Sequence, residues 1–544
     1  MEPQPAAKQR LYGFIAILVA SAFTFFFGLG RIGFLGPDEP RYAEVAREMF
    51  ASGDYISTRL CGCLWFEKPA LLYWMSAVGY HFFGVNELAA RIPSAVAAIA
   101  TVALLYFALR SINLPRLALA AAFVLSASGI FIAYAKVAVP DMILTTSITG
   151  ALLAAMQWTR SVGKRRTVYL LLSFASVALA TLAKGLVGIV LVLAIFGIYL
   201  FFVGQLREIR WRDCLIGTAV FIVVAGIWYV PVTMRHGWSF IDEFFIRHHF
   251  QRYTSNEFGH PQPFYFFFLV AIAGAAPWTF FVIPAIARLR SIRAKADSRD
   301  SLLLLAWIWI AVPLVFFSFS GSKLPGYILP IFPALAIVLG AEVERVWNRE
   351  RGRMLTIVVW MTAVMLIGIG VAFLVYSHRE SIDKSGMRIL LLALPLAIAL
   401  VSTMLLATQR ARAVIAGAGA LVVSLILAAV ILMLPVLRDE VTLKTLSLEA
   451  AAALRPGEKI AFYLKKEFAP VFYAEGRVLC EPKRGTTFYA LHQEMLAGAL
   501  EFEPSLIVIT NTNWLPGLQA DQRFSIEFIG EQGDSLALRV ALKK

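Results

Sequence analysis

The sequence has few charged residues and few cysteines for its length. Only 16% of its 544 residues are Asp, Glu, Lys or Arg, whereas soluble domains carry about a quarter. With 59% hydrophobic residues and a mean hydropathy of +0.72, the chain has too little polar surface to cover several soluble cores. Four cysteines exclude a disulfide-rich scaffold. No internal repeat is evident in the sequence. The run from Leu11 lacks a clear cleavage site for a signal peptide, so we expect it to remain as a membrane anchor. The composition indicates a polytopic membrane protein.

Apolar runs of about 20 residues, the length that a spanning helix needs, recur through the first 437 residues. Thirteen such runs begin near Leu11, Leu88, Leu117, Met142, Val168, Gly185, Leu215, Pro263, Leu302, Tyr327, Leu355, Ile389 and Val414. A further run, Pro69–Gly84, is short and aromatic, and we expect it to lie at the membrane interface without crossing.

The charges between the runs predict the orientation. If Pro69–Gly84 does not cross, the basic clusters within 160–166, 207–212, 288–299 and 345–353 fall on the same side as the N-terminus. The positive-inside rule then places the N-terminus in the cytoplasm and the C-terminus outside. Because much of the net charge of +15 is accounted for by this topology, no nucleic-acid partner is expected.

The composition changes after about residue 437, which predicts two domains. Residues 1–437 form the predicted membrane domain, with outer loops at 36–87 and 233–262. Residues 438–544 mix helical and extended patterns, which favours a small α/β domain on the outer side. The strand-like segments are Lys459–Leu464, Ser505–Thr510, Phe524–Ile529 and Leu536–Leu542, and the helix-like ones are Leu446–Leu454 and Tyr489–Leu500.

The first outer loop begins with two adjacent acids, Asp38 and Glu39. An amphipathic helix is predicted directly after them from apolar residues spaced three and four apart. Those residues are Tyr42, Val45, Ala46, Met49 and Phe50. Acids at a helix start can be simple N-terminal caps. Two acids beside Arg41 and Tyr42 at a membrane edge exceed what a cap needs, which favours a functional role.

Several separated motifs resemble one family. They are DEPRYAEVAREM from Asp38, FEKPALLYW from Phe66, VPDMILTT around Asp141, FFIRHHFQRY from Phe244 and SKLPGYILPIFPALA from Ser322. In this order they resemble the bacterial 4-amino-4-deoxy-L-arabinose lipid A transferases, which belong with the protein O-mannosyltransferase-like GT-C glycosyltransferases. The resemblance covers the membrane region, whereas the C-terminal domain matches only in position and size.

The resemblance implies a GT-C fold in the bacterial inner membrane, with an undecaprenyl phosphate-linked amino sugar as donor and a lipid A phosphate as acceptor. Such a reaction would take place on the periplasmic face and would confer resistance to polymyxin and other cationic peptides. Membrane lipids are the remaining expected partners, and a monomer is expected.

Breaking a glycosyl–phosphate bond develops positive charge on the sugar, which a carboxylate can stabilise. We predict Asp38 for this role, with Glu39 beside it and Asp141 from the second outer loop as a partner. A phosphate acceptor needs no strong base, because its second pKa is about 6. Asp38 would then orient and stabilise, whereas a hydroxyl acceptor would give it the role of general base.

The departing lipid phosphate requires cations at the membrane edge. The predicted phosphate-binding residues are Lys68, Arg252, Lys323 and Tyr327, with Arg41, Tyr42 and Lys184 as weaker candidates. For each basic residue the alternative is snorkelling toward lipid headgroups. Lys68 and Lys323 stand out because each lies close to a proline that would break a helix where a headgroup could enter.

A divalent metal is a further hypothesis. Glu67 could pair with His248 or His249 as ligands suited to zinc or manganese. No ligand-spacing motif supports this, and two histidines in an aromatic loop are also typical of an interfacial surface. Cys61 and Cys63 are one residue apart, which disfavours an unstrained disulfide between them. Free thiols are therefore the expectation.

Two other functions stay open. A GT-C transferase could pass another polyprenyl-linked sugar to protein Ser/Thr or to another glycolipid, because the acceptor is read by cavity shape. A transporter or flippase of lipid-linked sugars is less favoured, since its charges would lie near the midplane and repeats would be visible. A non-catalytic assembly factor is disfavoured by the paired acids and the basic residues near them.

Overall fold

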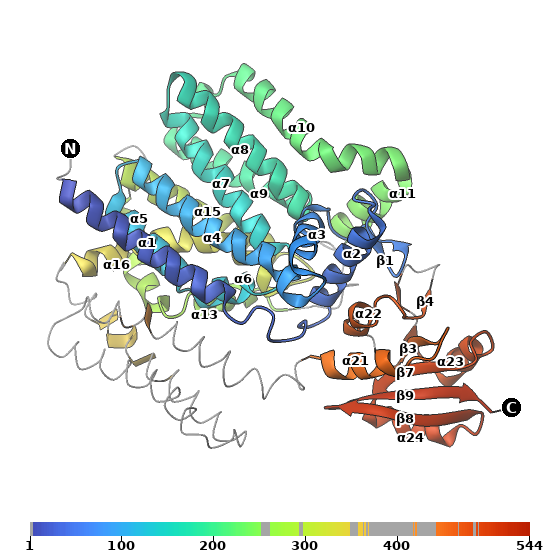
Figure 1. The fold of residues 1–544 in the computed structure, drawn as a ribbon. Coiled ribbons are helices and arrows are strands. Elements are labelled where there is room, and N and C mark those ends of the chain that lie inside the picture. Colours follow the sequence, from blue (N-terminus) through green and yellow to red (C-terminus); the bar gives the residue numbers. More distant parts are fainter. Residues whose placement is uncertain are drawn as a thin grey trace.

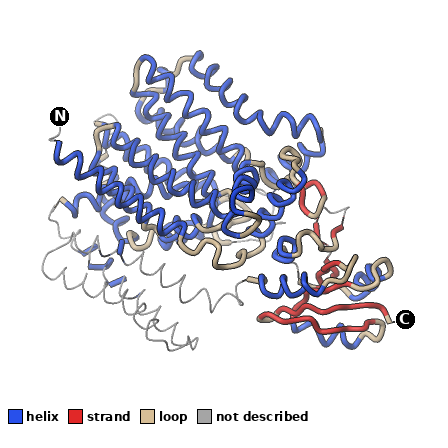
Figure 2. Tube along the Cα trace, in the orientation of Figure 1, coloured by secondary structure: helices blue, strands red, loops and turns tan. Residues whose placement is uncertain are grey.

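The computed structural model describes residues 4–251, 262–292, 297–348, 442–465, 467–481, 486–487 and 489–543, with a few isolated positions between 357 and 420. Within these ranges the part up to residue 348 is almost entirely helical, and the part from residue 442 contains a β-sheet (Figures 1 and 2).

The helical part contains long helices joined by short turns. The longer helices are α1 (Gln4–Phe26), α2 (Asp38–Ser52), α3 (Leu71–Phe83), α4 (Glu87–Ser111), α5 (Pro115–Ser126), α7 (Asp141–Arg160), α8 (Gly163–Lys184), α9 (Val187–Val203), α10 (Trp211–His236), α15 (Ser298–Ser318) and α16 (Phe332–Trp347). The shorter helical segments are α6 (Gly129–Ala135), η1 (Leu206–Glu208), α11 (Trp238–Ile241), η2 (Asp242–Gln251), α13 (Phe266–Gly274), η3 (Thr279–Phe281), α14 (Val282–Ala287), η4 (Leu289–Ser291) and η5 (Pro325–Ile331). A small hairpin, β1 (Arg59–Leu60) and β2 (Cys63–Leu64), follows α2.

Six helical segments of the described residues are long and apolar enough to cross a membrane. They are α1, α4, α8, α10, α15 and the continuous segment η5–α16; two bent pairs, α5 with α6 and α13 with the segment from η3, raise the number to eight. Helices α7 and α9 coincide with the other two predicted runs of this region, but neither is among the helices long and apolar enough to cross, and α9 is an apolar helix of 17 residues. The predicted runs from Leu355, Ile389 and Val414 lie outside the continuously described residues, so a total of thirteen stays a prediction.

The interior of the bundle depends on close helix approach. α7 packs along α8 and α4, and α5 packs along α16. At Gly340 of α16 an added Cβ would lie 2.8 Å from the backbone nitrogen of Ala121 in α5, so only glycine permits this separation. Small residues at helix contacts serve the same purpose in membrane bundles generally.

The aromatic run that we expected at the membrane interface forms α3. This helix has 13 residues and packs against α2 and α4. At 1.5 Å per residue it is too short to cross a hydrocarbon core of about 30 Å. The structure therefore agrees with the interfacial prediction on which the orientation depends.

The C-terminal part is an α/β domain, as predicted. Its central sheet has the order β6-β3-β7-β9-β8, in which β3 is parallel to β6 and β7, and β9 is antiparallel to β7 and β8. The strands are β3 (Lys459–Tyr463), β6 (Tyr489–Ala490), β7 (Leu506–Asn511), β8 (Phe524–Gln532) and β9 (Ser535–Leu542), with β4 (Cys480–Glu481) and β5 (Thr486–Thr487) as a separate pair. The helices are α21 (Lys444–Ala453), α22 (Ala469–Tyr473), α23 (Gln493–Leu500) and α24 (Leu515–Ala520), with a short turn η7 (Thr512–Trp514).

All four predicted strands are confirmed, but the predicted helix Tyr489–Leu500 is wrong at its start. Tyr489 and Ala490 form β6, which pairs with Phe462 and Tyr463. The helix begins only at Gln493, because the His492 side chain accepts a hydrogen bond from an amide of the first turn and acts as the cap.

The C-terminal domain contacts the first outer loop through α22, which lies beside α2 in Figure 1, and through Lys444 of α21. The Tyr473 hydroxyl donates to Glu87 at 2.8 Å and accepts from the Phe34 backbone amide at 3.1 Å. Lys444 forms an ion pair with the same Glu87 at 2.6 Å. The rings of Phe34 and Phe472 meet edge to face with centroids 4.8 Å apart. The domain is therefore held against the segment that carries the predicted acids.

Candidate functional site

Asp38 and Glu39 both lie in the first turn of α2, but their side chains have different surroundings. The Asp38 side chain is 37% exposed. Glu39 is 1% exposed and forms a two-point ion pair with Arg91 of α4, at 2.6 and 2.8 Å. Each Glu39 oxygen also accepts a backbone N–H at 2.8 Å, from Leu35 and from Ala138. Glu39 therefore holds the start of α2 in place, while Asp38 faces accessible space.

Arg91 is the centre of this buried joint. Its guanidinium donates to the backbone carbonyls of Leu29, Ile32 and Gly33 at 2.6 to 2.9 Å, in addition to Glu39. The segment that connects α1 to α2 is thus fixed by one side chain from α4. A buried ion pair with every lone pair occupied is the geometry that repays the cost of burying two charges.

Asp38 belongs to a chain of alternating charges, which we call the first-loop cluster: Asp38, Arg41, Glu67 and Lys68. Arg41 donates to Asp38 one helical turn away, and its guanidinium lies 3.2 Å from Glu67. Lys68 contacts the same Glu67 carboxylate at 3.1 Å. Glu67 is only 3% exposed, whereas Arg41 and Lys68 are 14% and 12% exposed. The cluster thus contains one accessible carboxylate backed by cations.

Arg41 is enclosed by aromatic rings. Its guanidinium carbon lies 5.4 Å from the Tyr42 ring centre, 5.7 Å from Trp65 and 5.3 Å from Phe468 of the C-terminal domain. Burial acts to lower the pKa of Arg41, but the charge of Glu67 and its neighbours outweighs burial and raises that pKa. Burial, and then the Glu67 charge, raise the pKa of Tyr42, whose phenol stays neutral.

Asp141 lies at the first turn of α7 and pairs with a cation from α8. Lys184, the last residue of α8, contacts Asp141 at 2.5 Å, and its ammonium lies 4.7 Å from the Tyr327 ring centre. Gly326 packs against this group: an added Cβ would lie 2.8 Å from Asp141 and 2.7 Å from the Tyr134 ring. We call Asp141, Lys184, Tyr327 and Tyr134 the second-loop cluster.

The two clusters are linked through the chain between α6 and α7. Glu39, next to Asp38, accepts a hydrogen bond at 2.8 Å from the amide of Ala138, three residues before Asp141. Residues from the first loop, the second loop and the segment before α16 therefore lie in one region of the structure. Tyr134 and Arg91 were not predicted. Arg91 could have been recognised from its position near the start of the apolar run from Leu88. Charged residues in such runs are rare, and they usually pair with another charge or have a functional role.

The other predicted residues are placed as follows. Lys323 is 8% exposed and donates to the Ser320 carbonyl at 2.7 Å, so it would have to leave that bond to reach a phosphate. Arg252 and the side chains of His248 and His249 lie outside the described residues. The described residues contain no group of three or more metal-ligating side chains, and Glu67 is engaged with Arg41 and Lys68. Metal binding therefore stays a hypothesis.

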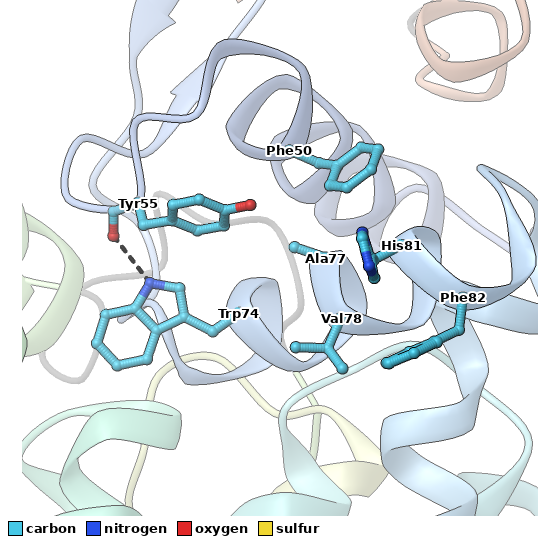
Figure 3. A pocket seen from close by; sticks show the side chains of 7 residues that line it. All are labelled: Phe50, Tyr55, Trp74, Ala77, Val78, His81 and Phe82. Atoms are coloured by element: carbon cyan, nitrogen blue, oxygen red, sulfur yellow. Dashed lines mark hydrogen bonds between the residues drawn. The ribbon is translucent and has the colours of Figure 1, made fainter.

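A separate pocket of about 490 Å³ opens on the face made by α2, α3 and the loop between them (Figure 3). It is lined by Phe50, Tyr55, Trp74, Ala77, Val78, His81 and Phe82. The Trp74 indole donates to the Tyr55 carbonyl at 2.8 Å, which fixes one wall. No residue of the two charged clusters contributes to this lining, so the pocket is distinct from the charged site.

The sequence is similar to a known protein family and to individual bacterial transferases. Residues 67–230 match the family described as dolichyl-phosphate-mannose-protein mannosyltransferase. An undecaprenyl phosphate-alpha-4-amino-4-deoxy-L-arabinose arabinosyl transferase 2 from Pseudomonas fluorescens is 30% identical over 389 residues, 69% of this chain and 65% of the relative. A Pseudomonas aeruginosa transferase of the same name, without the number, is 30% identical over 341 residues, 60% of this chain and 59% of the relative. The aligned parts thus span somewhat less than two thirds of these relatives.

The solved structure of ArnT from Cupriavidus metallidurans bound to undecaprenyl phosphate superposes with a TM-score of 0.79 at 23% identity. The match covers 97% of this chain and 98% of that one, including the C-terminal domain. The predicted GT-C fold is therefore confirmed. Part of the chain matches the protein O-mannosyltransferase family model. The chain is similar to the bacterial arabinosyl transferases named above, which confirms the resemblance drawn from the motifs.

Proposed function

We propose that the chain is an integral membrane glycosyltransferase that moves 4-amino-4-deoxy-L-arabinose from undecaprenyl phosphate to a phosphate group of lipid A. The observation that carries the proposal is the proximity of the first-loop and second-loop clusters, which the hydrogen bond from the Ala138 amide to Glu39 joins. Its support is the similarity to arabinosyl transferases along the membrane region and the shared fold.

In the proposed reaction an acceptor phosphate oxygen attacks the anomeric carbon of the sugar. The bond from that carbon to the carrier phosphate breaks, and the undecaprenyl phosphate leaves with the electron pair. Asp38 is the accessible carboxylate and is held by Arg41, so it is placed to stabilise positive charge on the sugar. Because the acceptor phosphate is already ionised near neutral pH, Asp38 need not remove a proton.

The leaving phosphate gains negative charge as the bond breaks, and cations must meet it. We assign this role to Lys68 and to Lys184 with Tyr327, with Arg252 included on its sequence alone. Lys68 and Lys184 are each bonded to a carboxylate at 3.1 and 2.5 Å. A bound phosphate would compete with these carboxylates for the ammonium protons. Arg41 and Tyr42 act here as positioning residues for Asp38, and Glu39 positions the start of α2.

The orientation is part of the proposal. We place the N-terminus in the cytoplasm and residues 438–544, together with both clusters, on the periplasmic side of the inner membrane. The clusters lie at the ends of helices that border the predicted outer loops, where a lipid carrier phosphate at the membrane edge could reach them. An added cationic sugar would reduce the negative charge of lipid A, and polymyxin would bind less well.

Reconstitution tests the proposal. Purified protein in vesicles receives undecaprenyl phosphate-aminoarabinose and lipid A, and mass spectrometry follows lipid A. We expect aminoarabinose-modified lipid A with the wild type and at least about a 100-fold lower rate with Asp38→Asn, as for loss of one electrostatic group at a reacting centre. Asp242→Asn, at an exposed acid, is the matched control and should remain active.

The alternatives give different results in the same experiment. Transfer to a Ser/Thr peptide or to another glycolipid, with lipid A unchanged, would move the protein to another acceptor. Movement of the donor across the vesicle membrane without any glycosylated product would identify a transporter. Wild-type modification of lipid A by Asp38→Asn would remove Asp38 from the reaction.

A further inference from the structure

Two cysteines from distant parts of the chain lie near the contact between the first outer loop and the C-terminal domain. Cys61 lies at the tip of the β1–β2 hairpin and packs against the main core, and Cys480 begins β4. The Cys480 side chain raises the pKa of the Cys61 thiol more than any other group does. Neither cysteine forms a disulfide in this structure.

The backbone at Cys61 is unusual for its residue type. Leu60 pairs with Cys63, so Cys61 and Gly62 form a two-residue hairpin turn. Their φ angles are 55° and 73°, the left-handed pair of a type I′ turn, which asparagine and glycine usually occupy. A cysteine tolerates that conformation only at a cost. Turn geometry alone does not explain a cysteine with positive φ at this position. The nearby Cys480 side chain gives the Cys61 thiol a role of its own.

Helix α2 supports both cysteine-bearing segments. On one side the Gly62 amide donates to Glu48 at 2.9 Å, which ties the hairpin tip to α2. On the other side the chain before β4 lies on the same helix, since a Cβ at Gly476 would lie 3.1 Å from the Arg47 guanidinium. Arg47 is itself bound to Glu44 by two hydrogen bonds of 2.7 Å. The two cysteines are thus brought together by contacts that do not involve sulfur.

We propose that Cys61 and Cys480 form a disulfide that fastens the C-terminal domain to the first outer loop. The inference rests on the periplasmic placement of both segments in the proposed function, because disulfides persist in oxidising compartments. It replaces the expectation that the Cys61 thiol stays free. The bond would hold α22 against α2 and thereby keep Phe468 on Arg41, 5.3 Å away.

The chemistry is a thiol–disulfide exchange. The two thiols lose two protons and two electrons, and one Cys61–Cys480 bond forms while a disulfide of an external oxidant is reduced to two thiols. The contact with Cys480 and burial raise the pKa of Cys61, and burial raises that of Cys63. Thiolate is therefore scarce in this loop, which slows the exchange. Oxidised glutathione or a disulfide oxidoreductase is the acceptor of the two electrons.

Peptide mapping tests the bond. The full chain is expressed in cells, free thiols are blocked with N-ethylmaleimide at lysis, and the purified protein is digested without reductant. We expect a cross-linked pair of peptides, one containing residue 61 and the other residue 480. The pair should persist in Cys63→Ser and in the control Cys214→Ser, and should disappear in Cys61→Ser and in Cys480→Ser. Oxidised glutathione should restore it after reduction of the wild type.

Two results would overturn the proposal: N-ethylmaleimide on both Cys61 and Cys480 of the wild type, or a cross-link that survives in Cys61→Ser. Lipid A transfer is measured on the same preparations, so the two proposals can fail separately. Labelled thiols in an active transferase refute only the disulfide. A cross-linked protein that modifies no lipid A refutes only the proposed function.

Discussion

Glu39 and Asp38 are neighbours in sequence, yet their neutral substitutions should have opposite consequences. In Glu39→Gln one carboxylate oxygen becomes an NH₂ group that faces an arginine N–H and a backbone amide, which are also donors. Two of four hydrogen bonds are lost, and the buried Arg91 charge loses its counter-ion. Removing one partner of a buried ion pair costs about 3–5 kcal/mol, which is a large part of a typical folding free energy of about 5–15 kcal/mol.

Asp38→Asn should cost much less stability. The Asp38 side chain is 37% exposed and Arg41 keeps its second carboxylate, Glu67. Exposed ion pairs contribute about 0–1 kcal/mol. We therefore expect Asp38→Asn to fold like the wild type and lose transfer, whereas Glu39→Gln should lose folded protein.

The assay is a heating series in detergent, followed by size-exclusion chromatography of the remaining monodisperse protein. The double variant Glu39→Gln/Arg91→Met is the control for coupling, since its cost should be smaller than the sum of the single costs when the two charges compensate each other. Equal thermal stability of Glu39→Gln and Asp38→Asn would refute the assignment of Glu39 as a structural anchor.

Four further predictions follow from the site and its supports. Gly326→Ala should reduce transfer by at least about tenfold with little change in folding, because its Cβ would lie 2.8 Å from Asp141 and small displacements at a reacting centre are costly; unchanged kinetics would refute the tight second-loop cluster. Lys68→Met should weaken binding of undecaprenyl phosphate, measured by ligand-dependent thermal stabilisation, while retained stabilisation would remove Lys68 from the phosphate site. Burial raises the pKa of Glu44 to about 7. The stability that Glu44 contributes is therefore present below its ordinary pKa and is lost as the pH rises through about 7, by up to about 3 kcal/mol. Glu44→Gln should flatten the plot of thermal stability against pH, and a wild-type plot that is already flat contradicts the shift. The metal hypothesis predicts zinc or manganese in purified protein and its loss in Glu67→Ala; metal-free protein with full activity would end it.

Local patterns predicted the elements well. The spacing of Tyr42, Val45, Ala46 and Met49 predicted α2, and all four residues are buried in it. The extended segments of the C-terminal domain became strands at nearly the predicted bounds. The shortness of Pro69–Gly84 was also informative, because α3 packs between neighbouring helices and is too short to cross.

Tertiary partners limited what the sequence could predict about the site. Nothing local distinguishes the solvated Asp38 from the buried Glu39, because the difference is made by Arg91, 52 residues away. Tyr134 was missed for the same reason, since it becomes relevant only where α6 meets Asp141 and Gly326. The approach of the Cys61 hairpin and the Cys480 strand to the same helix, α2, brings two domains together and cannot be recognised in either segment alone.

The most direct test of the proposed function is the mass spectrum of lipid A from cells that carry or lack this chain. We predict aminoarabinose on lipid A phosphate only in cells with the intact chain, and its absence in cells that carry Asp38→Asn at equal protein abundance. Identical lipid A in all three strains, with the donor lipid present, would contradict the proposed function.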